Sequence, residues 1–375
     1  MNSTQSPNNE DLRYYLALTQ APKIGPGIFK AIVAYAGSAS YFFKHPKGKV
    51  AKIPKVGPKL LAIRNQESEL LKKADALIAT CEKNGYTLLT SLHEDFPQRF
   101  KQQEDSPTLI FARGKSNLNF DRSIGIVGTR SATNYGKSTT RKIIEDLAIY
   151  QPAIISGLAY GIDIEAHRTA LQTGLSTIAV MGSPISQIYP AVHKNTAEAI
   201  MENGCVISEY PPEGKMNPGN FPARNRIIAS LSDALIVVEA AEKGGALITA
   251  EIAYSYDKDV FAVPGNLQSQ YSEGCNFLIR KLKANIYTGP SDVADALHWN
   301  KPGDISSKKT PLDLSGRNEA ECRILNLLME NGELEIDYLS MATDIPLGSL
   351  ASILLSMEFE GILKSLPGKK YKLLL

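Results

Sequence analysis

The sequence predicts an α/β protein with a Rossmann-like central domain, built on a doubly wound, mostly parallel sheet. From Ser123 onward, apolar runs of strand length alternate with amphipathic segments of helical length. The runs are almost continuously apolar, which is typical of parallel strands that helices cover on both faces. We assign strands to seven runs: SIGIVGT, PAIISG, STIAVMGS, CVISEY, DALIVVEA, DVFAVPG and ANIYTG.

Residues 1–80 predict a small helical domain before the sheet. Two similar segments, PKIGPGIFKAIVAYAG at 22–37 and IPKVGPKLLAIRN at 53–65, each place Gly-Pro before an amphipathic helix. This weak repeat resembles a helix-hairpin-helix pair or SAM-like domain, with Lys23 and Lys55 where that family's turn has its first glycine. It suits either a packing module with a basic rim or a DNA contact. Segment 81–120 is predicted to connect this domain to the sheet.

The Rossmann-like domain is predicted to span 121–299 and to end in a linker at 300–317, which is rich in Pro, Gly, Ser and Lys. Residues 318–375 predict three helices and a Gly-Lys-Lys hairpin, an order that resembles a winged helix. The helix that would enter a DNA groove ends near Glu358 and Glu360 and has no Lys or Arg. We therefore expect this domain to dock a partner or to regulate the protein, because a groove-binding helix needs positive charge.

Composition narrows the class of protein. No apolar run approaches the roughly 18 residues that cross a bilayer, and the N-terminus lacks an export signal, so we expect a cytoplasmic protein without a membrane contact. The four cysteines have no C-x-x-C spacing, which argues against a zinc site or disulfides. The net charge of +2 is too small for a global field that gathers nucleic acid. A polyanion site must come from local loops.

Three glycine-rich loops follow predicted strands. Ligands of doubly wound sheets bind beyond the carboxyl ends of the strands, where glycine lets the backbone approach an anion and helix N-termini supply N–H groups. Arg130 adds a guanidinium fork that suits phosphate. The candidate phosphate-binding residues of these loops are Gly128, Thr129, Arg130, Ser131, Ser156, Gly157, Gly244 and Gly245.

The stretch from Ser208 to Ser232 interleaves charged, aromatic and turn residues. Lys215, Arg224 and Arg226 can neutralise phosphates, Asn225 can donate amide hydrogen bonds, and Phe221 or Tyr210 can stack on an unpaired base. This combination favours single-stranded nucleic acid. The alternative is a surface loop in which Phe221 packs under the sheet edge and the arginines form ion pairs.

Cofactor and catalytic motifs are absent from the sequence. The glycines at 125, 128 and 136 do not form G-x-G-x-x-G, and the second strand ends in Ser156-Gly157 where an NAD-binding fold has an acidic residue. Asp163 and His167, four residues apart, make an incomplete metal-ligand set. We expect neither a cofactor nor a metal, and no catalytic residue.

Six motifs in order resemble the DNA processing protein A family, also called DprA or Smf. They are VGTRSATNYG at 127–136, SGLAYGIDIEAH at 156–167, YP at 189–190, FPARNRIIASLS at 221–232, GGALITAEIA at 244–253 and VPG at 263–265.

This resemblance implies a protein without enzymatic activity that binds incoming single-stranded DNA during natural transformation. It also implies a homodimer that loads the RecA recombinase. Arg130 then matches the phosphate-binding arginine and Phe221 the aromatic that meets a base. Members often have Lys after the Tyr-Pro pair and three residues before the Phe. Here these positions are Ala191 and Pro218, which leaves Lys194 and Lys215 as the nearest substitutes.

An enzyme is the alternative function. Nucleotide phosphoribohydrolases of the "lonely guy" group have the motif P-G-G-x-G-T-x-x-E, which shares Gly244, Gly245 and Glu251 with this chain. Lys243, Leu247 and Ile248 break it, and the apolar pair replaces the Gly-Thr that would meet a nucleotide phosphate.

Overall fold

The computed structural model describes residues 9–93, 95–115, 117–300, 317–366 and 368–373. The chain divides into two compact units, Met1–Trp299 and Asn300–Leu375. The predicted boundaries near residues 80 and 120 therefore do not separate compact bodies, because the N-terminal helices share a core with the sheet. Tyr15 and Phe29 of these helices belong to the same buried cluster as Phe111 and Met181 of the sheet.

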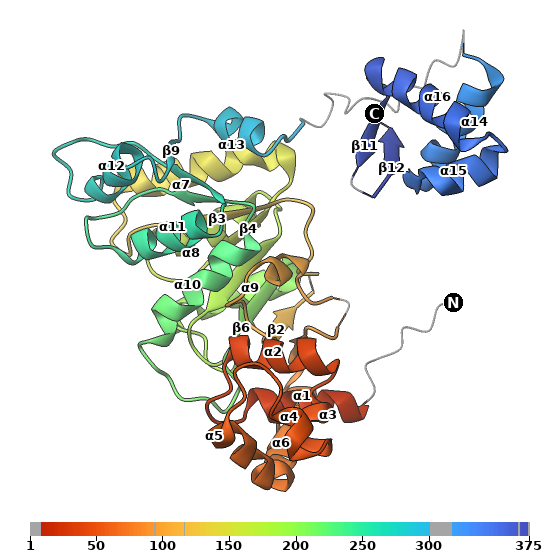
Figure 1. Cartoon of the computed structure of the whole chain (residues 1–375). Coiled ribbons are helices and arrows are strands. Elements are labelled where there is room, and N and C mark those ends of the chain that lie inside the picture. The colour runs from red at the N-terminus through yellow and green to blue at the C-terminus, as the bar shows by residue number, and fades with distance from the viewer. Residues whose placement is uncertain (1–8, 94, 116, 301–316, 367, 374–375) are drawn as a thin grey trace. The chain divides into compact units, whose positions relative to one another are not determined.

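The first unit is built on a nine-stranded sheet with the order β1-β2-β6-β5-β4-β3-β7-β8-β9 (Figure 1). Its seven strands from β3 onward coincide with the seven predicted runs and are all parallel, which confirms the large, mostly parallel sheet. They are β3 (Ser123–Val127), β4 (Ala153–Ser156), β5 (Thr177–Met181), β6 (Cys205–Ser208), β7 (Ala234–Val237), β8 (Asp259–Ala262) and β9 (Asn285–Ile286).

Segment 81–120 does more than connect. It supplies β1 (Thr87–Thr90) and β2 (Leu109–Gly114), and β2 pairs antiparallel with β6, with Phe111 opposite Ser208. The sheet thus gains an antiparallel edge that the sequence analysis did not predict. The two strands are short and separated by 18 residues, whose described part contains only the 3-10 helix η2 (Gln98–Gln102), so no hairpin signal marks them.

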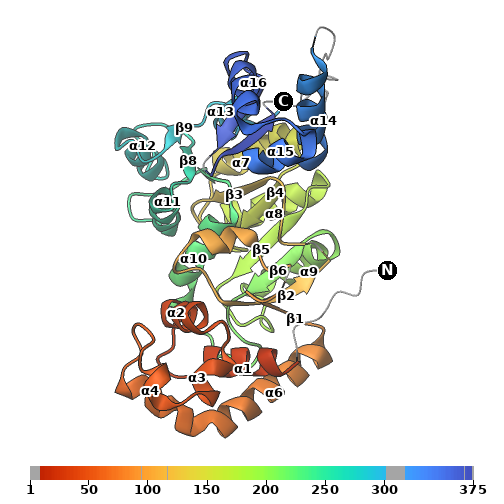
Figure 2. The same ribbon diagram turned by 45° about the vertical axis from the view of Figure 1, so that its right-hand side comes forward.

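Helices cover both faces of the sheet (Figure 2). Alternate residues of β3 point to opposite faces: Ile124 and Ile126 pack with α7, α8 and α13, whereas Val127 packs with α10, α11 and α12. The bounds are α7 (Asn134–Leu147), η3 (Ala148–Tyr150), α8 (Ile162–Gln172), η4 (Ala191–His193), α9 (Lys194–Asn203), α10 (Asn220–Leu231), α11 (Gly245–Ser255), α12 (Glu273–Arg280) and α13 (Pro290–Ala296).

The N-terminal helices contain the predicted repeat. Lys23 and Lys55 both have a left-handed backbone, with φ of 66° and 69°, and each lies two residues before the glycine that precedes a helix beginning with Pro. The relation of this repeat to helix-hairpin-helix or SAM-like domains stays a prediction. The elements are α1 (Asn9–Thr19), α2 (Pro26–Ala36), α3 (Ser40–Lys44), α4 (Lys47–Val50), α5 (Pro58–Leu61), η1 (Ala62–Gln66) and α6 (Glu67–Asn84).

The second unit has three helices and a three-stranded sheet of order β10-β12-β11. Glu358 accepts hydrogen bonds from the backbone and hydroxyl of Ser365, and Glu360 pairs with Arg317 at 2.5 Å. The winged-helix resemblance stays a prediction, and most of the predicted linker lies outside the described residues. The elements are α14 (Glu319–Asn331), β10 (Glu333–Glu335), α15 (Ile336–Thr343), α16 (Leu347–Phe359), β11 (Leu363–Leu366) and β12 (Lys370–Leu373).

No single helix of the described residues is long and apolar enough to span a membrane. The pair α15 and α16 reaches that length and composition only together, across a bend of 111°.

Candidate nucleic-acid interface

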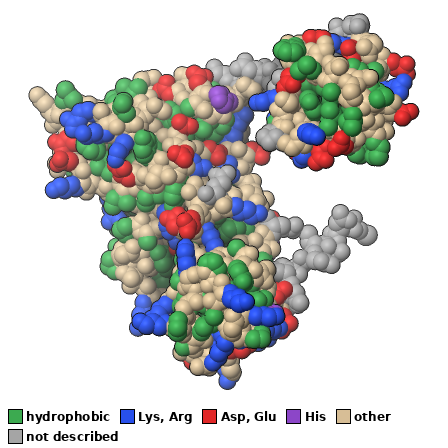
Figure 3. Space-filling model, in the orientation of Figure 1, with side chains coloured by type: hydrophobic (Ala, Val, Ile, Leu, Met, Phe, Trp, Pro, Cys, Tyr) green, Lys and Arg blue, Asp and Glu red, His purple; other side chains and the backbone are tan. Residues whose placement is uncertain are grey.

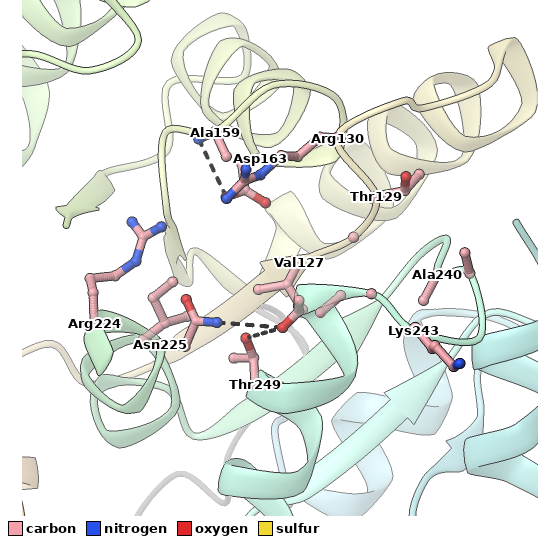
Figure 4. Close-up of a pocket in the computed structure, with 16 residues that line it drawn as sticks. Val127, Thr129, Arg130, Ala159, Asp163, Arg224, Asn225, Ala240, Lys243 and Thr249 are labelled. Atoms are coloured by element: carbon pink, nitrogen blue, oxygen red, sulfur yellow. Dashed lines mark hydrogen bonds between the residues drawn. The ribbon is translucent and has the colours of Figure 1, made fainter. Parts of the chain in front are cut away.

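A pocket of about 440 Å³ opens at the carboxyl ends of β3 and β7 (Figure 4). The strand order reverses between these two strands. On one side of β3 lie β4, β5 and β6, and on its other side lie β7, β8 and β9. Ligands of open α/β sheets bind at such a point. The lining residues are Val127, Gly128, Thr129, Arg130, Ala159, Asp163, Arg224, Asn225, Ile228, Ala240, Ala241, Lys243, Gly244, Gly245, Ala246 and Thr249.

Arg224 forms part of the pocket floor and is only 4% exposed. Its Nη1 donates to the carbonyl oxygen of Gly157 at 2.7 Å and also to that of Val180. Burial lowers the pKa of Arg224 to about 10, although the nearby Asp163 carboxylate opposes this shift. The Arg224 guanidinium thus ties α10 to β5 and to the residue that follows β4, and the phosphate contact of Arg224 stays a prediction.

Asp163, at the start of α8, closes the second predicted loop. Its Oδ2 accepts hydrogen bonds from the backbone N–H groups of Gly157 at 3.2 Å and Ala159 at 3.4 Å. The carboxylate thus takes the place that an external anion would need. Burial raises the pKa of Asp163, and the charge of Arg224 opposes that rise.

Ser156 and Gly157 are also structural. The Ser156 hydroxyl is buried and donates to the Ile126 carbonyl at 2.6 Å. A Cβ on Gly157 would lie 2.6 Å from two guanidinium nitrogens of Arg224, so this glycine leaves room for that side chain. The phosphate contacts predicted for both residues stay predictions.

The first loop is closed in the same way by Glu239, which follows β7. Its carboxylate accepts from the Thr133 backbone at 2.9 Å and from the Thr133 hydroxyl at 2.5 Å, immediately before α7. A Cβ on Gly136 would lie 2.1 Å from Glu239 Oε2. The helix start where a dinucleotide fold binds pyrophosphate is therefore occupied by the protein's own carboxylate.

The third loop remains open. Gly244 precedes α11 with extended backbone, and the Gly245 carbonyl accepts weak hydrogen bonds from Asn225 at 3.4 Å and Thr249 at 3.3 Å (Figure 4). Arg130 and Lys243 line the same pocket and are exposed. Within the described part of the chain, neither side chain has an ion-pair partner within 4.0 Å. The pocket therefore brings together two unpaired cations and an open glycine loop.

Arg226 and Phe221 lie outside the pocket lining. Arg226 Nη2 contacts both carboxylate oxygens of Glu209 at 2.7 Å and is largely buried, an ion pair of the kind that the alternative interpretation expects, and its phosphate contact stays a prediction. Phe221 is half-buried, with its ring 5.3 Å from that of Tyr189, which is 49% exposed. Phe221 precedes the pocket residue Arg224 by one turn of α10.

The two substitute lysines and Ser131 are exposed but do not line the pocket. Lys194 begins α9 and is 3.9 Å from Glu198, and Lys215 lies in the loop between β6 and α10. Ser131 donates its backbone N–H to the Thr129 hydroxyl. Gly128 and Thr129 do line the pocket, and the Thr129 N–H is already bonded to the Glu239 carbonyl.

Glu251 of the alternative enzyme motif and His167 of the incomplete metal-ligand set contact other parts of the protein. Glu251 pairs with Lys283 at 2.6 Å and does not line the pocket. His167 is fully buried against the Thr177 hydroxyl, and burial lowers its pKa to about 3. The described residues contain no group of three or more His, Cys, Asp or Glu side chains placed to hold a metal ion.

Residues 87–298 match the family model described as DNA recombination-mediator protein A. This match covers more than half of the chain. The chain belongs to this family. Protein Smf of Escherichia coli is 31% identical over 79% of the chain and 80% of its own length, and Protein Smf of Synechocystis is 29% identical over 97% and 99%. DNA processing protein DprA of Bacillus subtilis is 35% identical over 64% of the chain and 80% of its own length.

Solved structures of DprA proteins share the fold. The Streptococcus pneumoniae DprA structure has a TM-score of 0.65 and 31% identity, and the match covers 76% of this chain and 97% of that one. The Helicobacter pylori DprA structure, which addresses single-stranded DNA binding, has a TM-score of 0.52 and 31% identity over 57% and 97%. The DprA/Smf resemblance is thereby confirmed, and the family name describes a recombination mediator.

Sequence reasoning missed three features of this DprA-family site. Lys243 was noted only because it breaks an enzyme motif, although a lysine beside Gly-Gly after a strand is itself an anion signal. Tyr189 was noted only as part of a Tyr-Pro pair. The third feature is the pair of hydrogen bonds between Thr133 and Glu239. No local sequence pattern indicates them, because 106 residues separate the two side chains.

Proposed function

We propose that this DprA-family protein binds single-stranded DNA at the pocket between β3 and β7. Arg130 and Lys243 contact phosphate oxygens, and the Gly244-Gly245 backbone approaches the same strand. The observation that carries the proposal is the contrast among the three loops. Asp163 and Glu239 close two of them, whereas the third opens beside two cations without ion-pair partners among the described residues.

Phosphate is the ligand group that this pocket suits best. A guanidinium binds two phosphate oxygens at once, and an ammonium adds a point charge. The N-terminus of α11, preceded by two glycines, offers backbone N–H groups to the same anion. A pocket of about 440 Å³ is the size of a small-ligand site, so it holds a short part of a strand and the rest crosses the surface.

An unpaired strand fits better than a duplex because α10, which supplies Arg224 and Asn225 to the pocket, also carries one ring of an aromatic pair. Tyr189 and Phe221 form a tilted pair, and half of the Tyr189 side chain is exposed. Base–aromatic stacking contributes about 1–3 kcal/mol per base and requires a base that is free of its partner strand. Phe221 keeps its predicted role in this proposal, with Tyr189 added to it.

The same proposal includes a cytoplasmic homodimer that loads the RecA recombinase during natural transformation and has no enzymatic activity. The family's description as a recombination mediator supports the recombinase partner. Leu267 and Ile286, 87% and 48% exposed, line the same surface pocket at the β9 edge of the sheet, and exposed apolar side chains that share a surface favour a contact with a second copy.

The test is an equilibrium titration of labelled single-stranded DNA with the wild type, Arg130→Glu and Lys243→Glu at several salt concentrations. Each reversal should weaken binding by more than about tenfold and reduce the slope of log affinity against log salt by about one. Arg168→Glu is the matched control, since Arg168 is exposed on α8 outside the pocket lining. Wild-type affinity in both pocket variants, or an equal loss in the control, would refute the proposal.

A further inference from the structure

Positive charge is concentrated in the N-terminal helices. Residues 12–66 contain eight lysines, two arginines and no Asp or Glu, although the whole chain has a net charge of only +2. The rest of the chain holds 31 basic and 39 acidic residues, a net charge of −8. Figure 3 shows Lys and Arg side chains spread over the N-terminal helices at the lower end of the view.

The densest part of this charge is a row of lysines from α4 to α5. Lys49, Lys52, Lys55 and Lys59 are exposed, and each directly precedes a buried apolar residue: Val50, Ile53, Val56 and Leu60. The buried residues anchor the segment in the core, so the lysines project to the outside at intervals of three or four residues. We call these four side chains the lysine row.

Few carboxylates neutralise the lysine row. Lys55 is 3.6 Å from Glu104, an exposed pair of the kind that contributes little. Within the described parts of the chain, Lys49, Lys52 and Lys59 have no carboxylate within 4.0 Å. The conformation of the segment does not depend on these lysines, because its hydrogen bonds are made by backbone groups such as Val56 N–H to the Ile53 carbonyl. The charge is therefore free to act on a partner.

The surroundings of the lysine row favour a nucleic acid duplex over a membrane or a single strand. Tyr35, 51% exposed, is the one exposed large apolar side chain in residues 12–66, a stretch that the structure describes completely. A membrane-binding surface needs apolar side chains to insert, and a single-strand site needs aromatic rings to stack on bases. A row of lysines alone gains most from the ligand with the highest charge density, and duplex DNA carries one charge per roughly 1.7 Å of axis.

We propose that the lysine row is a second nucleic-acid site, which binds the phosphate backbone of double-stranded DNA without reading its sequence. This site lies apart from the pocket between β3 and β7, since no residue of the row lines that pocket. One chain can then hold an unpaired strand at the sheet and a duplex at the N-terminal helices.

The test measures binding of a labelled blunt-ended duplex by the full chain with Lys49, Lys52, Lys55 and Lys59 all replaced by Gln. The duplex affinity should fall by about tenfold or more, and the salt slope should fall by about 3 to 4, because each lost phosphate contact removes about 0.9. The thermal unfolding midpoint should not change, since all four side chains are exposed.

The matched control replaces four exposed lysines elsewhere, Lys83, Lys142, Lys281 and Lys364, by Gln, which changes the net charge equally. This control should retain duplex affinity within about twofold. An unchanged duplex affinity in the lysine-row variant, or an equal loss in the control, would overturn the proposal. So would tighter binding of the wild type to anionic lipid vesicles than to duplex. Failure of Arg130→Glu to weaken single-strand binding would count against the pocket alone.

Discussion

Two arginines of this site look alike in the sequence and have opposite roles in the structure. Arg130 is exposed at the pocket, whereas Arg224 is buried with its guanidinium bonded to backbone carbonyls of Gly157 and Val180. Both follow small or turn residues in motifs that resemble DprA. The sequence pattern alone does not show which face of α10 Arg224 occupies, so it could not separate the buried arginine from the exposed one.

Arg224→Met should therefore lower the free energy of unfolding by about 1–3 kcal/mol, because it leaves the carbonyl oxygens of Gly157 and Val180 without their donor. Arg130→Met removes no internal hydrogen bond known in the described residues and should change it by less than about 0.5 kcal/mol. Urea unfolding of both variants measures the difference. Equal effects of the two substitutions would mean that Arg224 is not a structural residue.

At the scale of elements, the helices that begin at the carboxyl edge of the sheet differ in whether a carboxylate of the protein accepts hydrogen bonds from the backbone N–H groups before them. Glu239 accepts a hydrogen bond from the backbone before α7, and Asp163 accepts one from the loop before α8. Gly244 and Gly245 form the open start of α11. The sequence predicted these strands and helices well because their apolar runs and turns are local signals. It could not predict which loops were already occupied, because the occupying carboxylates depend on tertiary packing.

Gly136→Ala and Gly245→Ala compare a closed and an open helix start. A Cβ at 136 would lie 2.1 Å from the Glu239 carboxylate, whereas a Cβ at 245 meets no atom within 4 Å. Gly136→Ala should lower the free energy of unfolding by about 1–3 kcal/mol, and Gly245→Ala should leave it unchanged or raise it by up to about 1 kcal/mol. Thermal or urea unfolding tests this, and a destabilised Gly245→Ala with a stable Gly136→Ala would contradict it.

At the scale of the whole molecule, the apolar strand pattern was enough to predict the parallel core, but not its extent. The antiparallel strands β1 and β2 join the sheet through pairing with β6, almost one hundred residues away. The N-terminal helices then share the core of the sheet, and Met1–Trp299 forms one compact unit. Short strands and long-range packing leave no periodic signal, which explains why the sequence did not indicate that the N-terminal helices share the core of the sheet.

The central claim is that single-stranded DNA occupies the pocket between β3 and β7. Lysine-modification footprinting tests it most directly, by measuring how fast an amine-reactive reagent modifies Lys243 with and without a saturating single-stranded oligonucleotide. Modification of Lys243 should slow several-fold in the wild type, while Lys142 on α7, outside the pocket lining, should react at an unchanged rate. An unchanged rate at Lys243 under saturating DNA would contradict the account.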